Sequence, residues 1–478
     1  MSNLDKKLRP TDDQKKALEK LWAFVDDDKL SVFILKGYAG TGKTTLIKVF
    51  ITSLKEYGRK YVLMASTGRA AKILSDKTNE CTSTIHSHLY SFSGFNQNLD
   101  KMAGSNWKTS DEPFLLKFGP KLFTEDDKGT IFIIDESSMI RDKPTVGSKQ
   151  AVFGSGNLLK DIFERNNFYK VIFIGDECQL PPVNSRFSPA LNKEYIEQSY
   201  NLATECFSLK DIVRQKEGND IISVSAKIRK LYANPPKNKW AKFPLKGCSN
   251  VKILPSVTNL ISKYVKKIKD KGYDAATLIT YSNKACGELA GIIRTSLGFS
   301  PDKLLEEGEL LLVTQNNLIS GLMNGDLVKV THVGHKESRA GLTFIHVEVE
   351  SITNQTRHSQ LIIQEIMDSV GQINLTQEQQ AALYIDFARR MHEMGYKTDS
   401  KEFYKMMCED IYINALRAVY GYVLTCHKAQ GGEWKDVYID IPRYLSHQPD
   451  SSTYQWLYTS ITRAVENIYV VDDFYITY

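Results

Sequence analysis

Gly37-Tyr38-Ala39-Gly40-Thr41-Gly42-Lys43-Thr44 is the stretch that decides the fold of this chain. It fits the pattern G-x-x-x-x-G-K-[ST] at every fixed position, and an apolar run, residues 31–35, precedes it. Residues 45–50, which follow it, have the pattern of a starting helix. Glycines let the backbone turn its N–H groups inward, at the positive end of such a helix. The stretch therefore predicts a phosphate-binding loop between a buried strand and a helix.

This loop supplies the first candidate site residues. The Lys43 ammonium is placed to reach the outer phosphates of a nucleotide, and the Thr44 hydroxyl is placed to ligate Mg²⁺. We therefore expect ATP and Mg²⁺ as cofactors, with a chance glycine-rich turn as the alternative. The predicted nucleotide-binding residues of the loop are Gly40, Thr41, Gly42, Lys43, Thr44 and Thr45.

Size and composition set wide limits. The 478 residues leave room for about three domains of about 150 residues each. The net charge of +6 is mild, so it is compatible with a nucleic-acid partner without proving one. No apolar run is long enough for a membrane span, and the charged segment 1–10 lacks the apolar centre of a signal peptide. The seven cysteines are scattered without a C-x-x-C pair, which predicts free thiols in a reducing cytoplasm.

Short apolar runs recur along the chain, each followed by a polar loop. In the first half they lie at residues 32–35, 130–134 and 171–174. Strands that are apolar on both faces and separated by helices indicate a parallel sheet covered on both sides, with ligands at the carboxyl ends of the strands. Fainter runs of the same kind follow in the second half, at residues 276–280, 422–425, 436–439 and 467–471.

Two segments interrupt this α/β rhythm. Residues 87–129 are polar and aromatic, and their rings suit either base stacking or a small satellite core. Residues 330–356 alternate apolar and polar side chains, which predicts a small antiparallel barrel, and residues 376–417 turn helical. The aromatic residues of the first segment are Tyr90, Phe92, Phe95, Trp107, Phe114, Phe118 and Phe123.

Two of the polar loops carry further chemistry. Asp135 and Glu136 come directly after an apolar strand, where one carboxylate can hold Mg²⁺ and the next can deprotonate an attacking water. Gln179, in the loop after the third strand, has an amide able to sense a γ-phosphate or that water. An ordinary acidic surface pair and a rigid Pro-Pro strand exit are the plainer interpretations.

The ordered set of motifs resembles superfamily-1 helicases, and the forms G-D-x-x-Q-L-P-P-V and H-K-A-Q-G resemble their RecD-like branch, superfamily 1B, which includes the Dda-like enzymes. The motifs span most of the chain: G-Y-A-G-T-G-K-T (37–44), A-S-T-G-R-A-A (65–71), S-T-I-H (83–86), D-E-S-S-M (135–139), G-D-E-C-Q-L-P-P-V (175–183), V-R-Q (213–215), T-C-H-K-A-Q-G-G-E (425–433) and Y-T-S-I-T-R-A (458–464).

The resemblance implies an α/β fold of two RecA-like domains, each carrying an inserted small domain, the second partly an SH3-like β-barrel. The first RecA-like domain would comprise residues 1–86 and 130–215, with a duplex-splitting insertion at 87–129. The second would comprise residues 216–329 and 418–478, with its insertion at 330–417.

The resemblance also implies roles for single residues. Lys43, Glu136, Gln179, Arg214 and Arg463 would act in hydrolysis, the two arginines by reaching the γ-phosphate. Gln14 would read the adenine edge, although it is also the kind of residue that an exposed helix carries. Glu433 would lie near the nucleotide sugar, and Thr44 and Asp135 would bind the metal.

Contacts to a nucleic-acid strand are expected from several loops. Ser66, Thr67 and Arg69 follow the strand pattern 61–65, where hydroxyls and free N–H groups suit phosphate contacts. Other candidates are suggested by the resemblance: His86, Asn324, His427 and Lys428. A structural histidine is an equal alternative for His86, and a tight turn is an alternative for Asn324.

The expected activity is ATP-dependent unwinding of DNA by a monomer that moves along a single strand from 5′ to 3′. Single-stranded and forked duplex DNA are the expected partners, with a single-strand-binding protein and replication or repair proteins as further candidates, and no membrane. Two alternatives stay open. One is a translocase that strips proteins from DNA, and the other is a P-loop ATPase or nucleotide kinase of another class.

Overall fold

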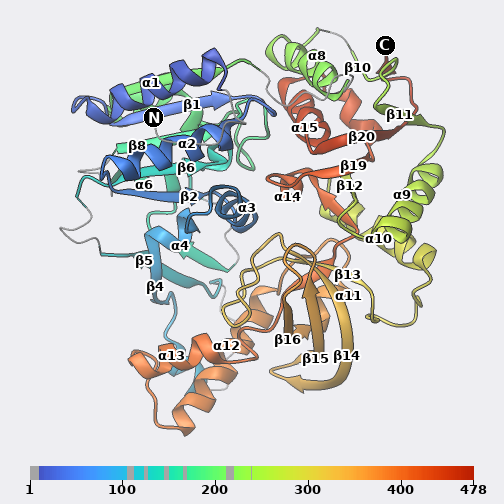
Figure 1. Ribbon diagram of the computed structural model, residues 1–478. Helices are drawn as coiled ribbons and strands as arrows, with labels where there is room; N and C mark the ends of the chain where they lie inside the picture. The colour runs from blue at the N-terminus through green and yellow to red at the C-terminus, as the bar shows by residue number, and fades with distance from the viewer. Residues whose placement is uncertain are drawn as a thin grey trace.

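The computed structural model describes residues 10–104, 112–122, 128–144, 150–164, 170–211, 220–237 and 239–478. Two lobes, each built on a parallel sheet, stand side by side, and two further sheets, of five and three strands, lie below them (Figure 1). The fold class expected from the sequence is confirmed: the molecule is α/β, with two RecA-like lobes of parallel strands and helices.

The first lobe holds a six-stranded sheet in the order β3-β2-β6-β8-β1-β9, in which every pairing is parallel. The apolar runs 32–35, 130–134 and 171–174 form three of its central strands, whose side chains are buried on both faces because helices cover the sheet. Its strands are β1 (Val32–Gly37), β2 (Tyr61–Ala65), β3 (Thr82–Thr84), β6 (Ile131–Asp135), β8 (Lys170–Gly175) and β9 (Thr204–Leu209). Its helices are α1 (Asp12–Asp26), α2 (Lys43–Glu56), α3 (Gly68–Thr78), α4 (Ile85–Leu89), α6 (Leu158–Glu164) and α7 (Lys193–Tyr200), with single turns η2 (Ser137–Met139) and η3 (Pro189–Leu191).

The second lobe holds a five-stranded parallel sheet in the order β11-β20-β19-β12-β18. Its strands are β11 (Val251–Leu254), β12 (Ala276–Thr280), β18 (Val423–Thr425), β19 (Trp434–Ile439) and β20 (Ala464–Val471), and a short pair joins β10 (Phe243–Pro244) to β21 (Ile476–Thr477). Its helices are α8 (Ile221–Ala233), α9 (Val257–Lys271), α10 (Asn283–Leu297), α14 (Cys426–Ala429) and α15 (Ser451–Ile461), with the turn η4 (Arg443–His447).

The alternating segment of the sequence forms an antiparallel sheet, as predicted, in the order β16-β15-β14-β13-β17. Buried side chains recur at alternate positions along β15, and its two faces pack on different apolar cores, Leu342 and Phe344 on one and Ile345, Val347 and Val349 on the other. The strands are β13 (Leu310–Val313), β14 (Leu327–Arg339), β15 (Leu342–Ser351), β16 (Arg357–Ile363) and β17 (Ala418–Tyr420), and the helices are α11 (Gln364–Asp368), α12 (Gln377–Glu393) and α13 (Lys401–Glu409). The SH3-like character of this sheet stays a prediction.

A three-stranded sheet projects below the first lobe. Its strands β4 (Tyr90–Phe95) and β5 (Leu116–Pro120) are antiparallel, and β7 (Ala151–Phe153) pairs with β5 in parallel. The short helix α5 (Leu99–Gly104) lies in the same projection. Because β7 comes from beyond residue 129 and β17 from beyond residue 417, the small sheets draw strands from both sides of the expected boundaries, and the domain limits stay a prediction.

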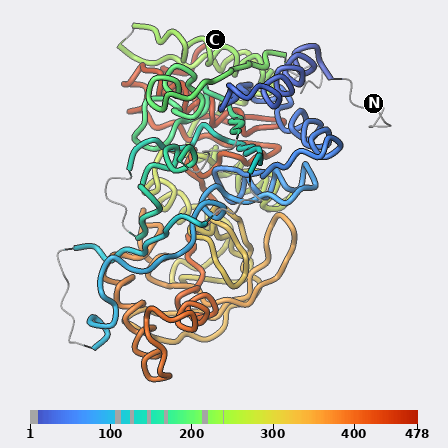
Figure 2. Tube along the Cα trace, turned by 90° about the vertical axis from the view of Figure 1, so that its left-hand side faces the viewer, coloured from blue at the N-terminus to red at the C-terminus, as the bar shows by residue number. Residues whose placement is uncertain are grey.

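The two insertions run side by side (Figure 2), and their side chains share one apolar core. Phe95 and Phe114 of the projection pack on Tyr384 of α12, each with ring centroids 5.6 Å apart. Both carboxylate oxygens of Asp100 are also engaged, one 2.7 Å from His392 Nε2 and the other accepting a bond from the Thr398 hydroxyl. The aromatic side chains of the projection thus build a satellite core, and Trp107 and Phe123 lie outside the described residues.

Two expectations about the whole chain can also be compared with the structure. All seven cysteines are free thiols, as the scattered pattern predicted. Within the described ranges, no helix combines the length and the apolar character that crossing a bilayer requires.

Candidate nucleotide site between the two lobes

A cavity of about 580 Å³ opens between the two lobes, and its wall is built from both. The first lobe contributes the phosphate-binding loop, the start of α2 and the loop after β6. The second lobe contributes the segment before β19 and the end of α15. The sequence-predicted residues that line it are Gly40, Gly42, Lys43, Thr44, Thr45, Asp135, Glu136, Gln179, Glu433 and Arg463.

The loop owes its curl to glycine. Gly40 and Gly42 have φ angles of 84° and 78°, in a left-handed region that residues with a side chain rarely adopt. Lys43 opens α2, and its ammonium donates to the carbonyl oxygens of Gly37 at 2.6 Å and Tyr38 at 3.1 Å. Thr41 is buried, and its hydroxyl donates to the same Tyr38 carbonyl. The loop therefore holds its own shape and leaves backbone N–H groups at the positive end of α2.

Gln14 is not an exposed helix residue, because it is buried against this loop. It is the third residue of α1, where its side-chain oxygen accepts from Thr11 N and completes a capping box. Its Nε2 donates to the Thr41 carbonyl at 3.2 Å. The start of α1 is thus tied directly to the phosphate-binding loop, and adenine reading by Gln14 stays a prediction.

Asp135 ends β6, and Glu136 follows with φ at 50°. This left-handed backbone conformation is costly for any residue other than glycine. The Glu136 N–H donates to Asp135 Oδ1 at 2.8 Å, which fixes the two carboxylates relative to each other. Burial raises the pKa of Asp135, and burial together with the Asp135 charge raises the pKa of Glu136. Arg463 and Lys43 oppose the shift at Glu136, so cations from both lobes favour its charged form.

Gln179 reaches the cavity from the loop after β8. Its side chain is buried, and its Oε1 has no hydrogen-bond partner among the described residues. A buried amide oxygen without a partner costs about 1–3 kcal/mol unless something else supplies a donor. This orphaned acceptor is suited to a water molecule held against a nucleotide.

Arg463 presents a buried guanidinium from the second lobe. Its nitrogens donate to the carbonyls of Thr459 at 3.1 Å and Gly432 at 3.3 Å, and to the Thr462 hydroxyl at 3.2 Å. These three acceptors are uncharged, so they orient the fork without neutralising it. Arg214 lies outside the described residues, and its predicted role is untouched by the structure.

Hydrogen bonds across the lobe boundary fix the cavity walls. The Tyr458 hydroxyl of α15 donates to Asp176 at 2.6 Å and accepts from Ala39 N at 3.3 Å. Leu180 N donates to the Thr459 hydroxyl at 2.9 Å. The sequence motifs contain Asp176 and Tyr458, yet nothing in their spacing showed that they pair, because the two stretches lie far apart along the chain.

Among the candidate strand contacts, Thr67 caps α3 by accepting from Ala70 N, and the Ser66 hydroxyl is buried without a partner among the described residues. Asn324, in the turn before β14, and Lys428, in α14, meet, since the ammonium donates to the amide oxygen at 2.5 Å. Burial lowers the pKa of Lys428 to about 8. Arg69 instead lies against Trp434 of the second lobe.

His86 and His427 lie near a shared cation that the sequence did not single out. Arg141 contributes to a lowered pKa at both histidines, after the larger effect of burial. The pKa of His86 falls to about 4, and its ring packs on Tyr90 and Phe153. A neutral ring held in an aromatic cluster supports the structural reading of His86, while strand contact by either histidine stays a prediction.

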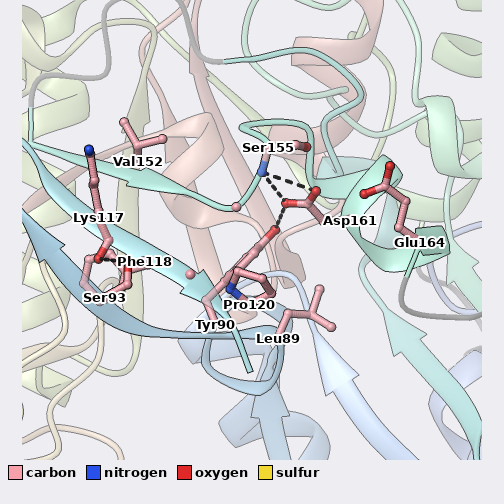
Figure 3. Close-up of a pocket in the computed structure, with 12 residues that line it drawn as sticks. Leu89, Tyr90, Ser93, Lys117, Phe118, Pro120, Val152, Ser155, Asp161 and Glu164 are labelled. Carbon is pink, nitrogen blue, oxygen red and sulfur yellow. Dashed lines mark hydrogen bonds between the residues drawn. The ribbon is translucent and has the colours of Figure 1, made fainter. Parts of the chain in front are cut away.

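A separate cavity of about 390 Å³ lies where the projection meets the first lobe, and it contains none of the predicted site residues (Figure 3). There the Tyr90 hydroxyl and the Ser155 N–H both donate to the buried carboxylate of Asp161. Gly154 approaches so closely that an added Cβ would lie 2.1 Å from that carboxylate. These contacts anchor the base of the projection on α6.

Two family models match the chain. An AAA domain model matches residues 9–234, and the model of the UvrD-like helicase C-terminal domain matches residues 420–471. The two matches cover the first lobe and the end of the second, which are the parts that supply the cavity.

Curated relatives point the same way. The chain is 25% identical over 491 residues to the ATP-dependent DNA helicase Dda of enterobacteria phage T4, covering 96% of this chain and 99% of that protein. It is 30% identical over 201 residues to the RecBCD enzyme subunit RecD of Buchnera aphidicola, covering 40% of this chain and 29% of that protein. An uncharacterised protein of Methanocaldococcus jannaschii is 25% identical over 93% of this chain, which spans 37% of its length.

A solved structure concerned with DNA unwinding at forked double-stranded DNA by two coordinating Pif1 helicases shares the fold. Its TM-score is 0.50 at 18% identity, covering 98% of this chain and 93% of that chain. Together with the ordered motifs and the two-lobed cavity, these matches identify the chain as a superfamily-1B helicase that resembles RecD and Dda.

Proposed function

We propose that this enzyme hydrolyses ATP between its lobes to move 5′ to 3′ along single-stranded DNA and to separate the duplex ahead. One observation carries the proposal: Lys43 and Glu136 of one lobe and Arg463 of the other line a single cavity. A nucleotide held there would touch both lobes, so its hydrolysis would change the contacts between them.

The residues of the cavity divide the chemistry among them. The loop N–H groups and Lys43 bind the phosphates, and Arg463 approaches the γ-phosphate from the opposite wall. Glu136 accepts the proton of the attacking water, and the orphaned Gln179 oxygen orients that water. An arginine contact of this kind can be worth about 10³–10⁵ in rate.

Mg²⁺ fits the donor set, because the Thr44 hydroxyl and the Asp135 carboxylate line the same cavity and oxygen ligands are what this cation prefers. Within the described ranges, no cluster of three or more His, Cys, Asp or Glu side chains could hold a metal by itself. A magnesium ion that takes its remaining ligands from phosphate and water agrees with that finding. The ion would neutralise phosphate charge.

Movement along a strand requires that each lobe bind the strand, and we call each set of binding residues a grip. Ser66 and Thr67 belong to the first lobe, whereas Lys428 belongs to α14 of the second. If ATP favours the closed arrangement of the lobes, the two grips approach when ATP binds and separate after hydrolysis. The projection β4–β5, which α12 and α13 brace, would meet the duplex.

Partial duplexes that carry either a 5′ or a 3′ single-stranded tail test direction and unwinding together. ATP-dependent strand release from the 5′-tailed duplex alone is the expected result. Release from the 3′-tailed duplex would reverse the direction. Displacement of a protein block from single strands without any strand release would favour the protein-stripping translocase.

Hydrolysis that no oligonucleotide stimulates would favour a P-loop ATPase of another class. Comparison of DNA with RNA oligonucleotides identifies the track. The relatives described as acting on DNA, Dda and the Pif1 helicases, support DNA as the expected substrate.

A further inference from the structure

Arg69 projects from the start of α3 across the lobe boundary. Its guanidinium carbon lies 4.5 Å from the ring centroid of Trp434, the first residue of β19. It also presses on Gly432, where an added Cβ would lie 2.7 Å from the same carbon. A cation over an indole face is attracted by the ring, more so when water is excluded. Arg69 is therefore packed onto the segment 431–434 of the opposite lobe.

That segment holds Arg463 at two points. The Gly432 carbonyl accepts from Arg463 Nη1 at 3.3 Å, and Trp434 N donates to the Arg463 carbonyl at 2.9 Å. Glu433, which lies between them, lines the nucleotide cavity. A displacement of the segment would consequently move the Arg463 guanidinium and the Glu433 carboxylate together.

The turn 323–326, between β13 and β14 of the antiparallel sheet, lies on the other side of Arg69. Asp326 favours the charged guanidinium, opposing a burial that lowers the Arg69 pKa to about 10. The turn holds its own shape, since Met323 N donates to Asp326 Oδ2 at 2.9 Å, and Met323 packs on Gly68. Arg69 is thus held between both lobes and the sheet inserted in the second.

A cavity of about 380 Å³ that Arg69 lines adjoins the nucleotide cavity. Ile73, Lys77, Gly431 and Glu433 belong to the walls of both. Arg69 Nη1 is buried and has no hydrogen-bond partner among the described residues. The contacts of the guanidinium are therefore those with Trp434 and Gly432, beside the nucleotide cavity. A side chain that contacts a phosphate from the protein surface would be exposed instead.

We propose that Arg69 is a positioning residue for hydrolysis, which holds the segment 431–434 against the first lobe and so keeps Arg463 aimed at the γ-phosphate. This role replaces the strand contact expected for Arg69 from its motif. It rests on the proposed function, because it assumes that Arg463 reaches the nucleotide. In this role Arg69 also links the two lobes directly beside the nucleotide cavity.

The first test compares Arg69→Ala, Arg69→Lys and Trp434→Leu in the full chain. Hydrolysis at saturating oligonucleotide is expected to fall about 10- to 100-fold in Arg69→Ala and Trp434→Leu, with a partial return in Arg69→Lys, which keeps a cation over the ring. Binding of a fluorescent oligonucleotide without nucleotide should change less than about twofold. Asp76→Ala, at an exposed position of α3, is the matched control and should leave both unchanged.

The second test is a double-mutant cycle between Arg69→Ala and Arg463→Ala. If Arg69 acts through Arg463, the double variant should hydrolyse ATP no more slowly than Arg463→Ala alone. Effects that multiply would show that Arg69 acts independently and would overturn the proposal. So would an oligonucleotide affinity that drops tenfold or more in Arg69→Ala while saturated turnover stays normal.

The proposed function and the positioning role of Arg69 predict different failures. If the unaltered protein shows no oligonucleotide-stimulated hydrolysis, the proposed function itself is wrong. If it shows that stimulation and Arg69→Ala retains full turnover, only the positioning role is wrong. Thermal melting of each variant, expected to stay within a few degrees of the parent, separates either outcome from misfolding.

Discussion

Glu136 combines two costs at one residue, because its backbone is left-handed and its carboxylate is buried beside Asp135. A strained conformation of this kind costs on the order of 1–3 kcal/mol and persists only where its surroundings enforce it. The surroundings here are the Asp135 carboxylate, which accepts the Glu136 N–H, and the turn η2, which Glu136 precedes. In this conformation the Glu136 side chain lines the cavity.

Replacement of Glu136 by glutamine tests its role as the base. Glu136→Gln keeps the shape of the side chain but cannot accept a proton, so hydrolysis should fall by about 10²–10⁴. Binding of a fluorescent ATP analogue should persist. Phosphate release and analogue titration measure the two effects, and an unchanged rate of phosphate release would remove Glu136 from the mechanism.

His86 makes the stability of the first lobe depend on pH. Its folded pKa of about 4 lies below its ordinary value, so its contribution to stability is complete above about pH 6.5 and is lost as pH falls toward 4. At pH 5 the loss is about 2 kcal/mol, from burial and, to a lesser degree, from Arg141, with Asp161 opposing.

His86→Phe keeps a ring against Tyr90 and Phe153 but removes the titration. Urea unfolding of the parent and this variant at pH 7.5 and pH 5.0 checks the expectation. The loss of stability on acidification should be smaller in the variant by about that amount. An equal loss in both proteins would show that His86 is protonated in the folded state.

At the scale of elements, α15 and the loop after β8 form the joint between the lobes. Cys178 and Leu180 of that loop belong to the apolar core of the second lobe, although the loop starts from a strand of the first. The side chain of Gln455 donates to the carbonyls of Glu177 and Gln179. Gln179, the proposed γ-phosphate sensor, is consequently held by the opposite lobe, so movement of the lobes would change how it orients a water.

Tyr458→Phe should weaken this joint. It removes the hydroxyl that donates to the buried Asp176, and an unsatisfied carboxylate oxygen costs about 1–3 kcal/mol. A melting temperature lower by a few degrees and a turnover about tenfold slower are expected. The matched control is Tyr478→Phe at an exposed tyrosine, and Tyr458→Phe with the melting and turnover of the parent would contradict the linkage.

At the scale of the whole molecule, the two insertions form an arch beneath the lobes (Figures 1 and 2). The arch is closed by the aromatic core around Tyr384 and by the polar contacts of Asp100, His392 and Thr398. It joins the projection of the first lobe to the helices inserted in the second. A force on the projection would therefore be shared between the lobes.

Tyr384→Ala should open this arch without touching the nucleotide cavity. We expect oligonucleotide-stimulated hydrolysis within about twofold of the parent and strand separation reduced about 10-fold or more, because the projection loses its brace. Lys405→Ala, at an exposed position of α13, serves as the control. Parallel loss of hydrolysis and unwinding in Tyr384→Ala would show that the core supports the fold rather than strand separation alone.

Sequence alone predicted those features that depend on neighbours along the chain. The phosphate-binding loop, the strands that precede Asp135 and Gln179, and the alternation of β15 follow from local sterics and hydrophobic periodicity. The ordered motifs added the two-lobed fold and most of the cavity lining, which the structure brings together.

The tertiary structure decided the contacts between distant segments, because only packing determines which far-apart side chains meet. It buried Gln14 against the phosphate-binding loop, and it paired Asn324 with Lys428. It also placed Arg69 on Trp434, where a residue of the expected strand-binding motif lies beside the nucleotide cavity. Periodicity carries no information on such pairs, since they depend on how the two lobes and their insertions fit together.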